Sequence, residues 1–250
     1  MTKLTINGRV FDIDMIVFDK DGTLIELDFL WGRQIEKWGY LIQSRLQLED
    51  AFLHSMYEQM GYDFQNGRLI PDGPAAVATI DQFMAIGSFL IYRRGDVSWT
   101  EAEEAVIASA EQSVAFAPEP DMLKMIGDVI GVFENLRRRK IRIGVLTSDD
   151  RIPTEKTIDM LNWRPYIDAI GCGNDPIPGK PAPDGLLQIS KEMNIPTSRM
   201  LMVGDSTGDM RAGKSAGVAG CIGVGQLGDG VTAVADVMIQ SIEDILVLED

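Results

Sequence analysis

The stretch Val17-Phe18-Asp19-Lys20-Asp21-Gly22-Thr23-Leu24 decides the fold that we predict for this chain. Its first two residues complete an apolar run, Met15 to Phe18, which is short and contains the β-branched residues typical of a buried strand. Two carboxylates therefore follow the end of a strand, where open α/β sheets bind their ligands. Asp19 can attack an electrophile, Asp21 can transfer protons, and Gly22 lets the chain turn away sharply.

Two simpler interpretations of an Asp-x-Asp-Gly sequence compete with this one. A calcium-binding EF-hand loop would need an acid or amide near position 23 and a glutamate near position 30, where the chain has Thr23 and Leu30. An ordinary turn needs nothing more than these residue types, so it stays open as an interpretation of this stretch alone.

The composition limits the class of protein and its partners. The chain has 250 residues, 45% of them apolar, which suits one large domain or a core that carries an inserted domain. With 23 basic and 38 acidic residues the formal net charge is −15, which disfavours nucleic acid and anionic membranes as partners. An anionic substrate must then be bound by local positive charge, from a metal ion or a few lysines and arginines.

Other features predict a cytoplasmic protein and leave its oligomeric state open. No apolar run reaches about 18 residues, and the first five residues lack the basic and apolar regions of a signal peptide. Cys172 and Cys221 are isolated in the sequence, which fits a reducing compartment and argues against a structural zinc site.

The first half of the chain predicts a hairpin, one core strand and a long helical insert. Residues 3 to 18 read as a hairpin, turning at Asn7-Gly8, that enters the first core strand. Apolar residues then recur at helical spacing from residue 29 to about 115, and Thr100 with Glu103 predicts a capping box. A linker is expected at Pro118 to Pro120, followed by one helix from Met122 to Leu136.

Short apolar runs and helical segments alternate in the second half. Strands are expected at 141–146, 169–170, 200–203, 221–224 and 237–239, with helices from about 154 and at 185–193 and 209–216. Such alternation predicts right-handed crossovers, and hence an α/β, Rossmann-like, mainly parallel sheet core with an inserted α-helical domain. We assign residues 1–24 and 118–250 to the core domain and 25–117 to the helical domain.

Three further motifs follow strands or begin helices. Thr147 and Ser148 follow a strand and offer hydroxyl and N–H groups to an anion, and Lys180 offers a point charge between prolines. Asp205 and Asp209 follow another strand and, with Asp19, form an oxygen-rich set that suits Mg²⁺. Each motif taken alone has a simpler interpretation, as an ordinary strand end, an exposed lysine or a helix cap.

The four motifs together resemble those of the haloacid dehalogenase-like superfamily of hydrolases. They are Asp19-Lys20-Asp21-Gly22-Thr23, Thr147-Ser148, Lys180-Pro181 and Gly204-Asp205-Ser206-Thr207-Gly208-Asp209. The insert looks like the small C1-type helical cap domain of that family, and the branch it resembles is that of the phosphoglycolate phosphatases. The resemblance implies Asp19 as the nucleophile, and Asp21 as the general acid and base that also lends its backbone carbonyl to Mg²⁺.

The resemblance also implies roles for the remaining residues. Thr23 would support Asp21, and Gly22 is a further supporting residue. Thr147 and Ser148 would bind the phosphoryl oxygens. Lys180 would neutralise the charges of Asp19 and the phosphate. Asp205 and Asp209 would hold the metal directly or through water. The chain departs from the family pattern at two places. Lys20 separates the two acids, and its side chain is expected to point away. Phosphoglycolate phosphatases often have asparagine directly after the threonine, where this chain has Ser148 followed by Asp149-Asp150.

The resemblance predicts a Mg²⁺-dependent phosphatase that cleaves a small phosphomonoester through an aspartyl-phosphate. A phosphosugar mutase of the same superfamily keeps both aspartates and stays open, as does a phosphate-binding regulatory protein without turnover. The helical domain is expected to be a lid, with Trp31, Arg33, Arg93 and Arg94 as candidates for substrate selectivity. For the two adjacent arginines, charges exposed at a helix end are the simpler interpretation.

Overall fold

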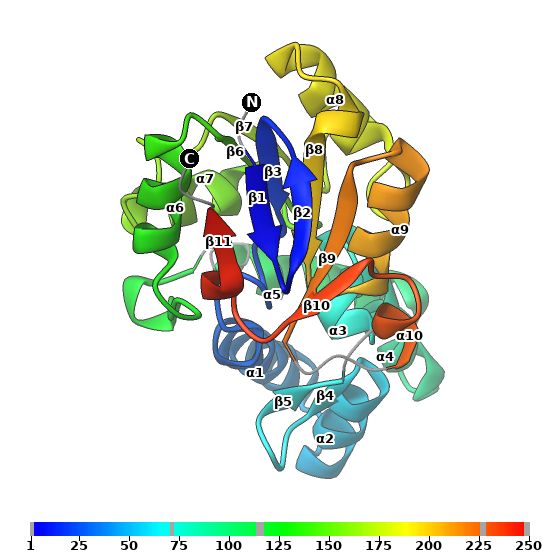
Figure 1. Ribbon diagram of the computed structural model, residues 1–250. Coiled ribbons are helices and arrows are strands. Elements are labelled where there is room, and N and C mark those ends of the chain that lie inside the picture. The colour runs from blue at the N-terminus through cyan, green and yellow to red at the C-terminus, as the bar shows by residue number, and fades with distance from the viewer. Residues whose placement is uncertain (1–2, 71–72, 114–117, 226–228, 248–250) are drawn as a thin grey trace. The chain divides into compact units, whose positions relative to one another are not determined.

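The computed structural model describes residues 3–70, 73–113, 118–225 and 229–247 (Figure 1). Internal contacts divide the chain into two compact units, Met1–Glu26 with Lys124–Asp250 and Leu27–Leu123, called the core unit and the inserted unit below. Among the described residues, no helix is both long and apolar enough to cross a membrane.

The core unit is built on a six-stranded sheet in the order β10-β9-β8-β3-β6-β7, with every neighbouring pair parallel. Its strands are β3 (Met15–Phe18), β6 (Arg142–Leu146), β7 (Ala169–Gly171), β8 (Met200–Gly204), β9 (Gly220–Val224) and β10 (Val237–Ile239). The α/β, Rossmann-like, mainly parallel sheet is therefore confirmed. All four residues of β3 are buried, as expected for a central strand that is covered on both faces.

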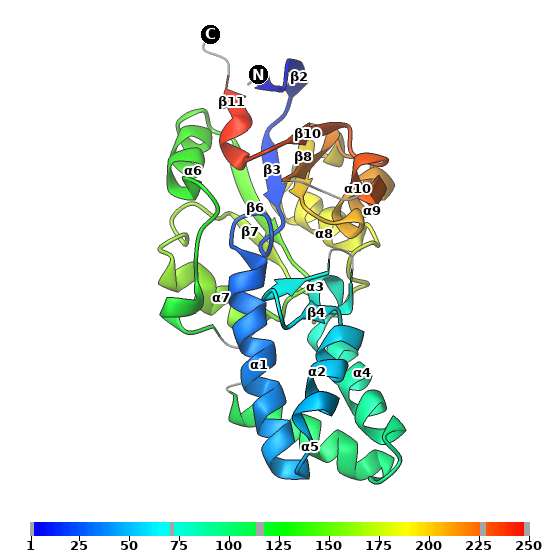
Figure 2. The same ribbon diagram turned by 90° about the horizontal axis from the view of Figure 1, so that it is seen from below.

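Helices cover both faces of this sheet. They are α6 (Val129–Arg138), α7 (Arg151–Met160), α8 (Asp184–Met193), α9 (Thr207–Ala216) and the short α10 (Asp229–Thr232), with 3-10 turns at Thr197–Arg199 and Ile242–Asp244. Both views place α6 and α7 on one side of the strands and α8 and α9 on the other (Figures 1 and 2). Phe18 meets Phe133 of α6 on the first side, and Val17 packs with Leu186 of α8 on the second.

The N-terminal hairpin is confirmed, but it lies outside the main sheet. β1 (Lys3–Ile6) and β2 (Arg9–Asp12) pair antiparallel across Asn7 and Gly8, whose φ angles are both positive, at 47° and 79°. The sequence did not predict β11 (Ile245–Val247), which pairs with β1 and completes a separate three-stranded sheet.

The helix predicted from Met122 to Leu136 was placed too early. Residues 123–128 are irregular, and α6 begins only at Val129. Gly127 has a φ of +71°, which breaks a right-handed helix, and the Asp128 carboxylate then caps α6 by accepting from the Gly131 N–H at 2.9 Å. The apolar residues from Val129 onward do form one face of a helix. The prediction extended the helix too far toward the N-terminus, because it did not recognise Gly127 as a break and Asp128 as the N-cap.

The inserted unit is mainly helical and has its own core. It contains α1 (Leu27–Leu46), α2 (Asp50–Gln59), α3 (Pro74–Val77), α4 (Ile80–Arg93), α5 (Trp99–Gln112), a 3-10 turn at Pro120–Met122, and the small hairpin of β4 (Tyr62–Asp63) and β5 (Arg68–Leu69). Fully buried Trp38 of α1 packs against Phe83 of α4, with ring centroids 5.4 Å apart. Positions 114–117, where we placed the end of the insert, lie outside the described residues.

The predicted capping box at Thr100 and Glu103 was wrong by two residues. Ser98 is the N-cap of α5: its hydroxyl accepts from the Glu101 N–H, while the Glu101 carboxylate accepts from the Ser98 N–H at 2.8 Å. The sequence offers the same pattern at both positions, and the helix begins two residues earlier than expected, at Trp99.

The two segments that join the inserted unit to the core unit run beside one another. Ile25 bridges Met125 in antiparallel fashion, and the Glu26 N–H donates to the Lys124 carbonyl at 2.8 Å. The contact boundaries fall after Glu26 and after Leu123, close to the boundaries at 24 and 118 expected from the sequence.

Candidate active site

Three strands deliver the predicted motifs to one edge of the sheet. β3 lies between β8 and β6, and the register aligns Phe18 with Val203 on one side and with Val145 on the other. Because the strands are parallel, the residues that follow them gather at their carboxyl ends. Asp19 follows β3, Thr147 follows β6 and Asp205 follows β8.

Lys180 lies at the centre of this group. It comes from the loop before α8, and its Nζ donates to Asp19 Oδ1 at 2.5 Å and to Asp209 Oδ1 at 2.6 Å. The side chains are nearly buried, with exposed fractions of 6% for Lys180 and 7% for Asp19. Solvent therefore screens these charges poorly, and the lysine fixes the position of both carboxylates.

Asp209 is oriented by the helix that carries it. It is residue N3 of α9, and its Oδ2 accepts from the backbone N–H and the hydroxyl of the N-cap Ser206, at 3.0 and 2.7 Å. A Cβ on Gly204 would lie 2.4 Å from this Oδ2, so only glycine lets the carboxylate pack there. The sequence analysis did not identify Ser206 as a partner of Asp209, although S-x-x-D before a helix is the signal for it.

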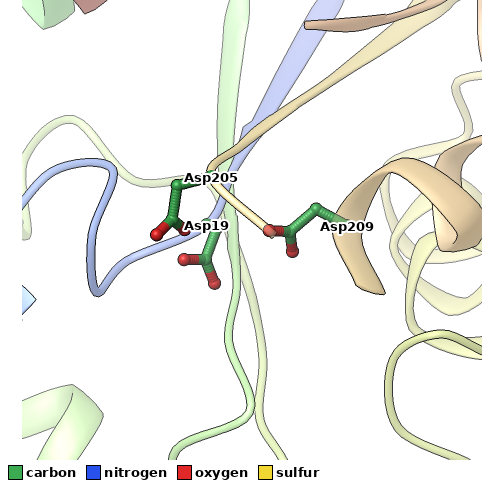
Figure 3. A group of neighbouring side chains, drawn as sticks. All are labelled: Asp19, Asp205 and Asp209. Carbon is green, nitrogen blue, oxygen red and sulfur yellow. The ribbon is translucent and has the colours of Figure 1, made fainter. Parts of the chain in front are cut away.

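Asp19, Asp205 and Asp209 form a group that can hold a metal ion. One carboxylate oxygen from each lies within 4.8 Å of the others, and Figure 3 shows the three side chains directed toward a common space. Lys180 supplies one positive charge against these three carboxylates, so the group is short of positive charge when all are ionised. A hard divalent cation such as Mg²⁺ fits both the charge and the oxygen donors.

Burial and mutual repulsion raise the pKa values of two of these acids. Burial raises the pKa of Asp19 to about 7, opposed by Lys180 and assisted by Asp209. Burial and the charges of Asp19 and Asp209 also hold the pKa of Asp205 well above its usual range. Burial alone would lower the pKa of Lys180, but the neighbouring Asp19 and Asp209 raise it instead, so this lysine stays protonated.

Gly22 and Thr23 position Asp205. Gly22 has a φ of +87°, and a Cβ there would lie only 2.0 Å from Asp205 Oδ2. The hydroxyl of the fully buried Thr23 donates to Asp205 Oδ1 at 3.4 Å. The resemblance assigned Thr23 to the support of Asp21, whereas its recorded hydrogen bond goes to Asp205.

Thr147 and Lys180 line one pocket beside this group. The backbone N–H of Thr147 donates to the Gly171 carbonyl, and its hydroxyl accepts from the Asp149 N–H at 3.1 Å, so the loop after β6 is held in a tight turn. Ser148 follows in the same turn and is partly exposed. This position suits Thr147 for binding an anion next to Lys180, whereas Ser148 is not among the residues that line this pocket.

The expectation that Lys20 points away was wrong. Its side chain is fully buried, and its Nζ lies 2.6 and 2.7 Å from the two carboxylate oxygens of Asp21 and 3.1 Å from Asp149 Oδ2. Asp21 therefore does not join the metal-binding group through its side chain. The chain bends at Lys20, which lets two consecutive side chains meet.

The candidate selectivity residues of the inserted unit have partners there. Trp31 packs against the core of that unit, and Arg33 stacks on Phe29 at 4.8 Å from the ring centroid. Arg94 donates to Asp96 Oδ1 at 2.6 Å through its Nε and lies over Phe52. Arg93 is exposed over Phe89, at 5.9 Å from the ring centroid.

Comparison with known proteins agrees with this fold. The family model described as haloacid dehalogenase-like hydrolase matches residues 13–217, which include all four motifs. The chain therefore belongs to the haloacid dehalogenase-like hydrolases. The predicted resemblance is confirmed, and with it the prediction of a hydrolase.

Two relatives with curated names are phosphatases. The chain is 24% identical over 233 residues to validoxylamine A 7′-phosphate phosphatase of Streptomyces hygroscopicus subsp. limoneus, covering 92% of this chain and 94% of that protein. It is 31% identical over 127 residues to phosphoglycolate phosphatase of Escherichia coli (strain K12), a match that covers 48% of either protein. These names support the predicted class of enzyme, a phosphoric monoester hydrolase.

Solved structures show the same fold. A HAD phosphatase from Thermococcus onnurineus superposes with a TM-score of 0.63 at 19% identity, covering 93% of this chain and 95% of that one. A candidate β-phosphoglucomutase from Thermotoga maritima gives a TM-score of 0.64 at 19% identity, over 93% and 96% of the two chains.

Proposed function

We propose that this hydrolase is a Mg²⁺-dependent phosphatase that acts on a small phosphomonoester through an aspartyl-phosphate on Asp19. The observation that carries the proposal is the contact of Lys180 with Asp19, at 2.5 Å, beside two further acids. A carboxylate that stands at a strand end with a fixed ammonium next to it is suited to attack a phosphorus atom whose oxygens are negatively charged.

The first step forms a bond between an Asp19 oxygen and phosphorus, while the bond from phosphorus to the ester oxygen breaks. Attack of an anion on a phosphate dianion is opposed by their repulsion, which Lys180 offsets. Thr147 and Ser148 would bind the phosphoryl oxygens, supported by the position of Thr147 in the pocket that Lys180 also lines. A phosphate bound beside Lys180, which contacts Asp19 at 2.5 Å, would lie next to the nucleophile before reaction.

Asp21 would carry the proton in both steps. As an acid it would give its proton to the leaving ester oxygen, so that an alcohol departs. As a carboxylate it would then accept a proton from the water that attacks the aspartyl-phosphate, which releases phosphate and restores Asp19. Its side chain is mostly buried, and the exposed fraction of 10% is the part that a substrate or water would reach.

The acidic group is the proposed Mg²⁺ site. Asp19 and Asp205 would hold the ion, with Asp209 acting directly or through water and the backbone carbonyl of Asp21 as a further ligand. When bound, Mg²⁺ would supply positive charge that lowers the repulsion between Asp19 and the phosphate. Because Asp209 already accepts from Lys180 and Ser206, its main contribution is the positioning of Lys180.

The substrate class follows from the named relatives. Both are phosphatases named for phosphorylated small molecules, and the longer match covers 94% of its relative. We assign this chain the same general class, a small phosphorylated metabolite. The inserted unit is proposed to act as the C1-type cap domain that selects among such metabolites, since it forms a compact unit with its own core.

The test is to incubate the purified protein with a panel of phosphate esters, with and without Mg²⁺. We expect phosphate release that needs the metal, and its loss in Asp19→Asn. Asp159→Asn is the matched control, because Asp159 is an exposed helix residue paired with Arg164 and should leave activity unchanged. Isomerised sugar phosphate without phosphate release would identify a mutase, and binding of phosphate without any turnover would identify a regulatory protein.

A further inference from the structure

Lys20 is a buried cation that connects two acids from different loops. It follows Asp19 in the loop after β3, and Asp149 lies in the loop after β6. The Lys20 Nζ contacts both oxygens of Asp21, at 2.6 and 2.7 Å, and one oxygen of Asp149, at 3.1 Å. The three side chains are exposed by 0%, 10% and 5% for Lys20, Asp21 and Asp149, so the group is nearly closed to water.

Such a group restricts motion more than a pair on the surface does. An exposed ion pair is screened by water and contributes little, whereas a buried charge must keep its partners because it is costly to leave unpaired. Rotation of Asp21 away from Lys20 would cost the buried ammonium its two shorter contacts and leave it with the one to Asp149 at 3.1 Å. The conformation of Asp21 is therefore tied to the position of the Lys20 Nζ.

Asp149 fixes the other end of the group. Its Oδ1 accepts from the Asp150 N–H at 2.8 Å, its own N–H donates to the Thr147 hydroxyl at 3.1 Å, and its carbonyl accepts from the Gly173 N–H at 2.8 Å. Asp149 is thus locked into the turn that carries Thr147. A continuous polar connection runs from Asp21 through Lys20 to the loop proposed to bind phosphate.

We propose that Lys20, anchored by Asp149, is the positioning residue for the Asp21 carboxylate in proton transfer, and that it couples this carboxylate to the Thr147 loop. The inference rests on the proposed function, in which Asp21 handles the proton. It assigns roles to Lys20 and Asp149, which lie at the two places where the chain departs from the family pattern.

The simpler alternative is that Lys20 only neutralises the buried Asp149. The distances argue against it, because the shorter contacts of the ammonium go to Asp21, and to both of its oxygens. A cation that served Asp149 alone would not need to hold a second carboxylate through two contacts. The alternative also predicts a different kinetic result, since it leaves Asp21 free.

The experiment follows the release of nitrophenolate from p-nitrophenyl phosphate after rapid mixing with the Mg²⁺-loaded enzyme. This leaving group needs no proton, so formation of the phosphoenzyme should stay fast when Asp21 is misplaced, while its hydrolysis by water slows. Lys20→Met should therefore show a burst of nitrophenolate of about one per active site, followed by a steady rate lowered about tenfold or more. Asp21→Asn provides the reference burst, and a general loss of folded enzyme cannot create one.

Two comparisons decide between positioning and a structural role. In an Asp21→Asn background, Lys20→Met should lower the steady rate little further, because the group that it positions is already gone. An equal loss in both backgrounds, or a lowered rate without a burst, would overturn the proposal. Lys214→Met is the control: Lys214 pairs with the surface residue Asp236 at 2.6 Å and should leave both phases unchanged.

A second variant covers the case in which Lys20→Met does not fold because Asp149 is left unpaired. The double variant Lys20→Met, Asp149→Asn removes the ammonium together with the Asp149 charge that it would leave unpaired, so it should fold, yet it should show the same burst. Wild-type kinetics from this double variant would overturn the proposal. No Mg²⁺-dependent phosphate release from the wild-type enzyme, or unchanged release from Asp19→Asn, would instead refute the proposed function. The two failures are therefore distinguishable.

Discussion

At the scale of single residues, Gly22 determines how closely the loop from Asp19 to Thr23 approaches Asp205. Its φ of +87° is strained for any residue with a side chain, and a Cβ would lie 2.0 Å from Asp205 Oδ2. Gly22→Ala should therefore displace Asp205 and lower kcat/KM by about tenfold or more, as small misplacements of catalytic groups do. Steady-state kinetics with a phosphate ester at saturating Mg²⁺ measures the effect.

Gly217→Ala separates the displacement from the backbone strain. Gly217 also has a positive φ, +68°, but no atom lies within 4 Å of a Cβ placed there. Both variants should lose stability, by about 1 kcal/mol or more, yet only Gly22→Ala should lose activity. Equal activity of the two variants would show that Asp205 tolerates the shift.

The charge of Asp19 makes stability depend on pH. In the metal-free protein its pKa is raised from 3.8 to about 7, chiefly by burial. Since the folded state holds this proton more tightly than the unfolded state does, the stabilising contribution is full below pH 3.8 and is lost as the pH rises through about 7. The melting temperature of the metal-free protein should therefore fall as the pH rises over this range. In Asp19→Asn the fall should be smaller, because the variant lacks this titrating group.

Mg²⁺ should reverse this trend. The ion competes with the proton for Asp19, so its stabilising effect should be larger at pH 8 than at pH 5.5, and a hundredfold excess over the dissociation constant corresponds to about 2.7 kcal/mol. Thermal melts with Mg²⁺ and with excess chelator at both pH values measure it. A shift in melting temperature that does not change with pH would place the ion away from Asp19.

At the scale of secondary-structure elements, α5 begins at Trp99 because Ser98 caps it. The Ser98 hydroxyl and the Glu101 carboxylate each satisfy a backbone N–H of the first turn. Ser98→Ala should lower the free energy of unfolding of the inserted unit by about 1 kcal/mol. Thr100 lies inside the helix and is exposed, so Thr100→Ala is the matched control and should have little effect. Urea denaturation followed by circular dichroism compares the two variants.

The elements that the sequence predicted well are those with a strong local signal. β3, β8 and β9 are short, buried apolar runs, and their periodicity needs no knowledge of the rest of the chain. The pairing of β11 with β1 joins the two ends of the sequence, and nothing local in Ile245–Val247 indicates that partner. The start of α6 depended on the φ angle of Gly127, which the sequence permits but does not require.

The candidate site shows the same limit. The ends of β3, β6 and β8 could be predicted to converge, because parallel strands bring their carboxyl ends together. The contact of Lys20 with Asp149 could not be predicted, because it depends on side-chain directions in two loops. Each residue was visible in the sequence only as a departure from a pattern, and the structure shows that they are in contact.

At the scale of the whole molecule, the net charge of −15 makes local cations important for binding an anionic substrate. In the core unit, Lys180 supplies one next to Asp19. Trp31 is partly buried and packs against the core of the inserted unit, and Arg33 lies 3.9 Å from Asp121 there. Arg94 is engaged by Asp96, whereas Arg93 is exposed at the end of α4 and lies over the Phe89 ring. Arg93 is therefore the better candidate for substrate selectivity.

If the inserted unit selects the substrate through Arg93, its effect should depend on the ester that is hydrolysed. Arg93→Ala should lower kcat/KM for the best natural substrate about tenfold, which is about 1.4 kcal/mol, and leave p-nitrophenyl phosphate nearly unchanged. Arg94→Ala is the matched control, because its guanidinium is held by Asp96 and should contribute little to selectivity. The same loss on both esters, or none on either, would remove Arg93 from substrate selection. A selective loss in Arg94→Ala alone would transfer the role to Arg94 and show that its pairing with Asp96 opens when substrate binds.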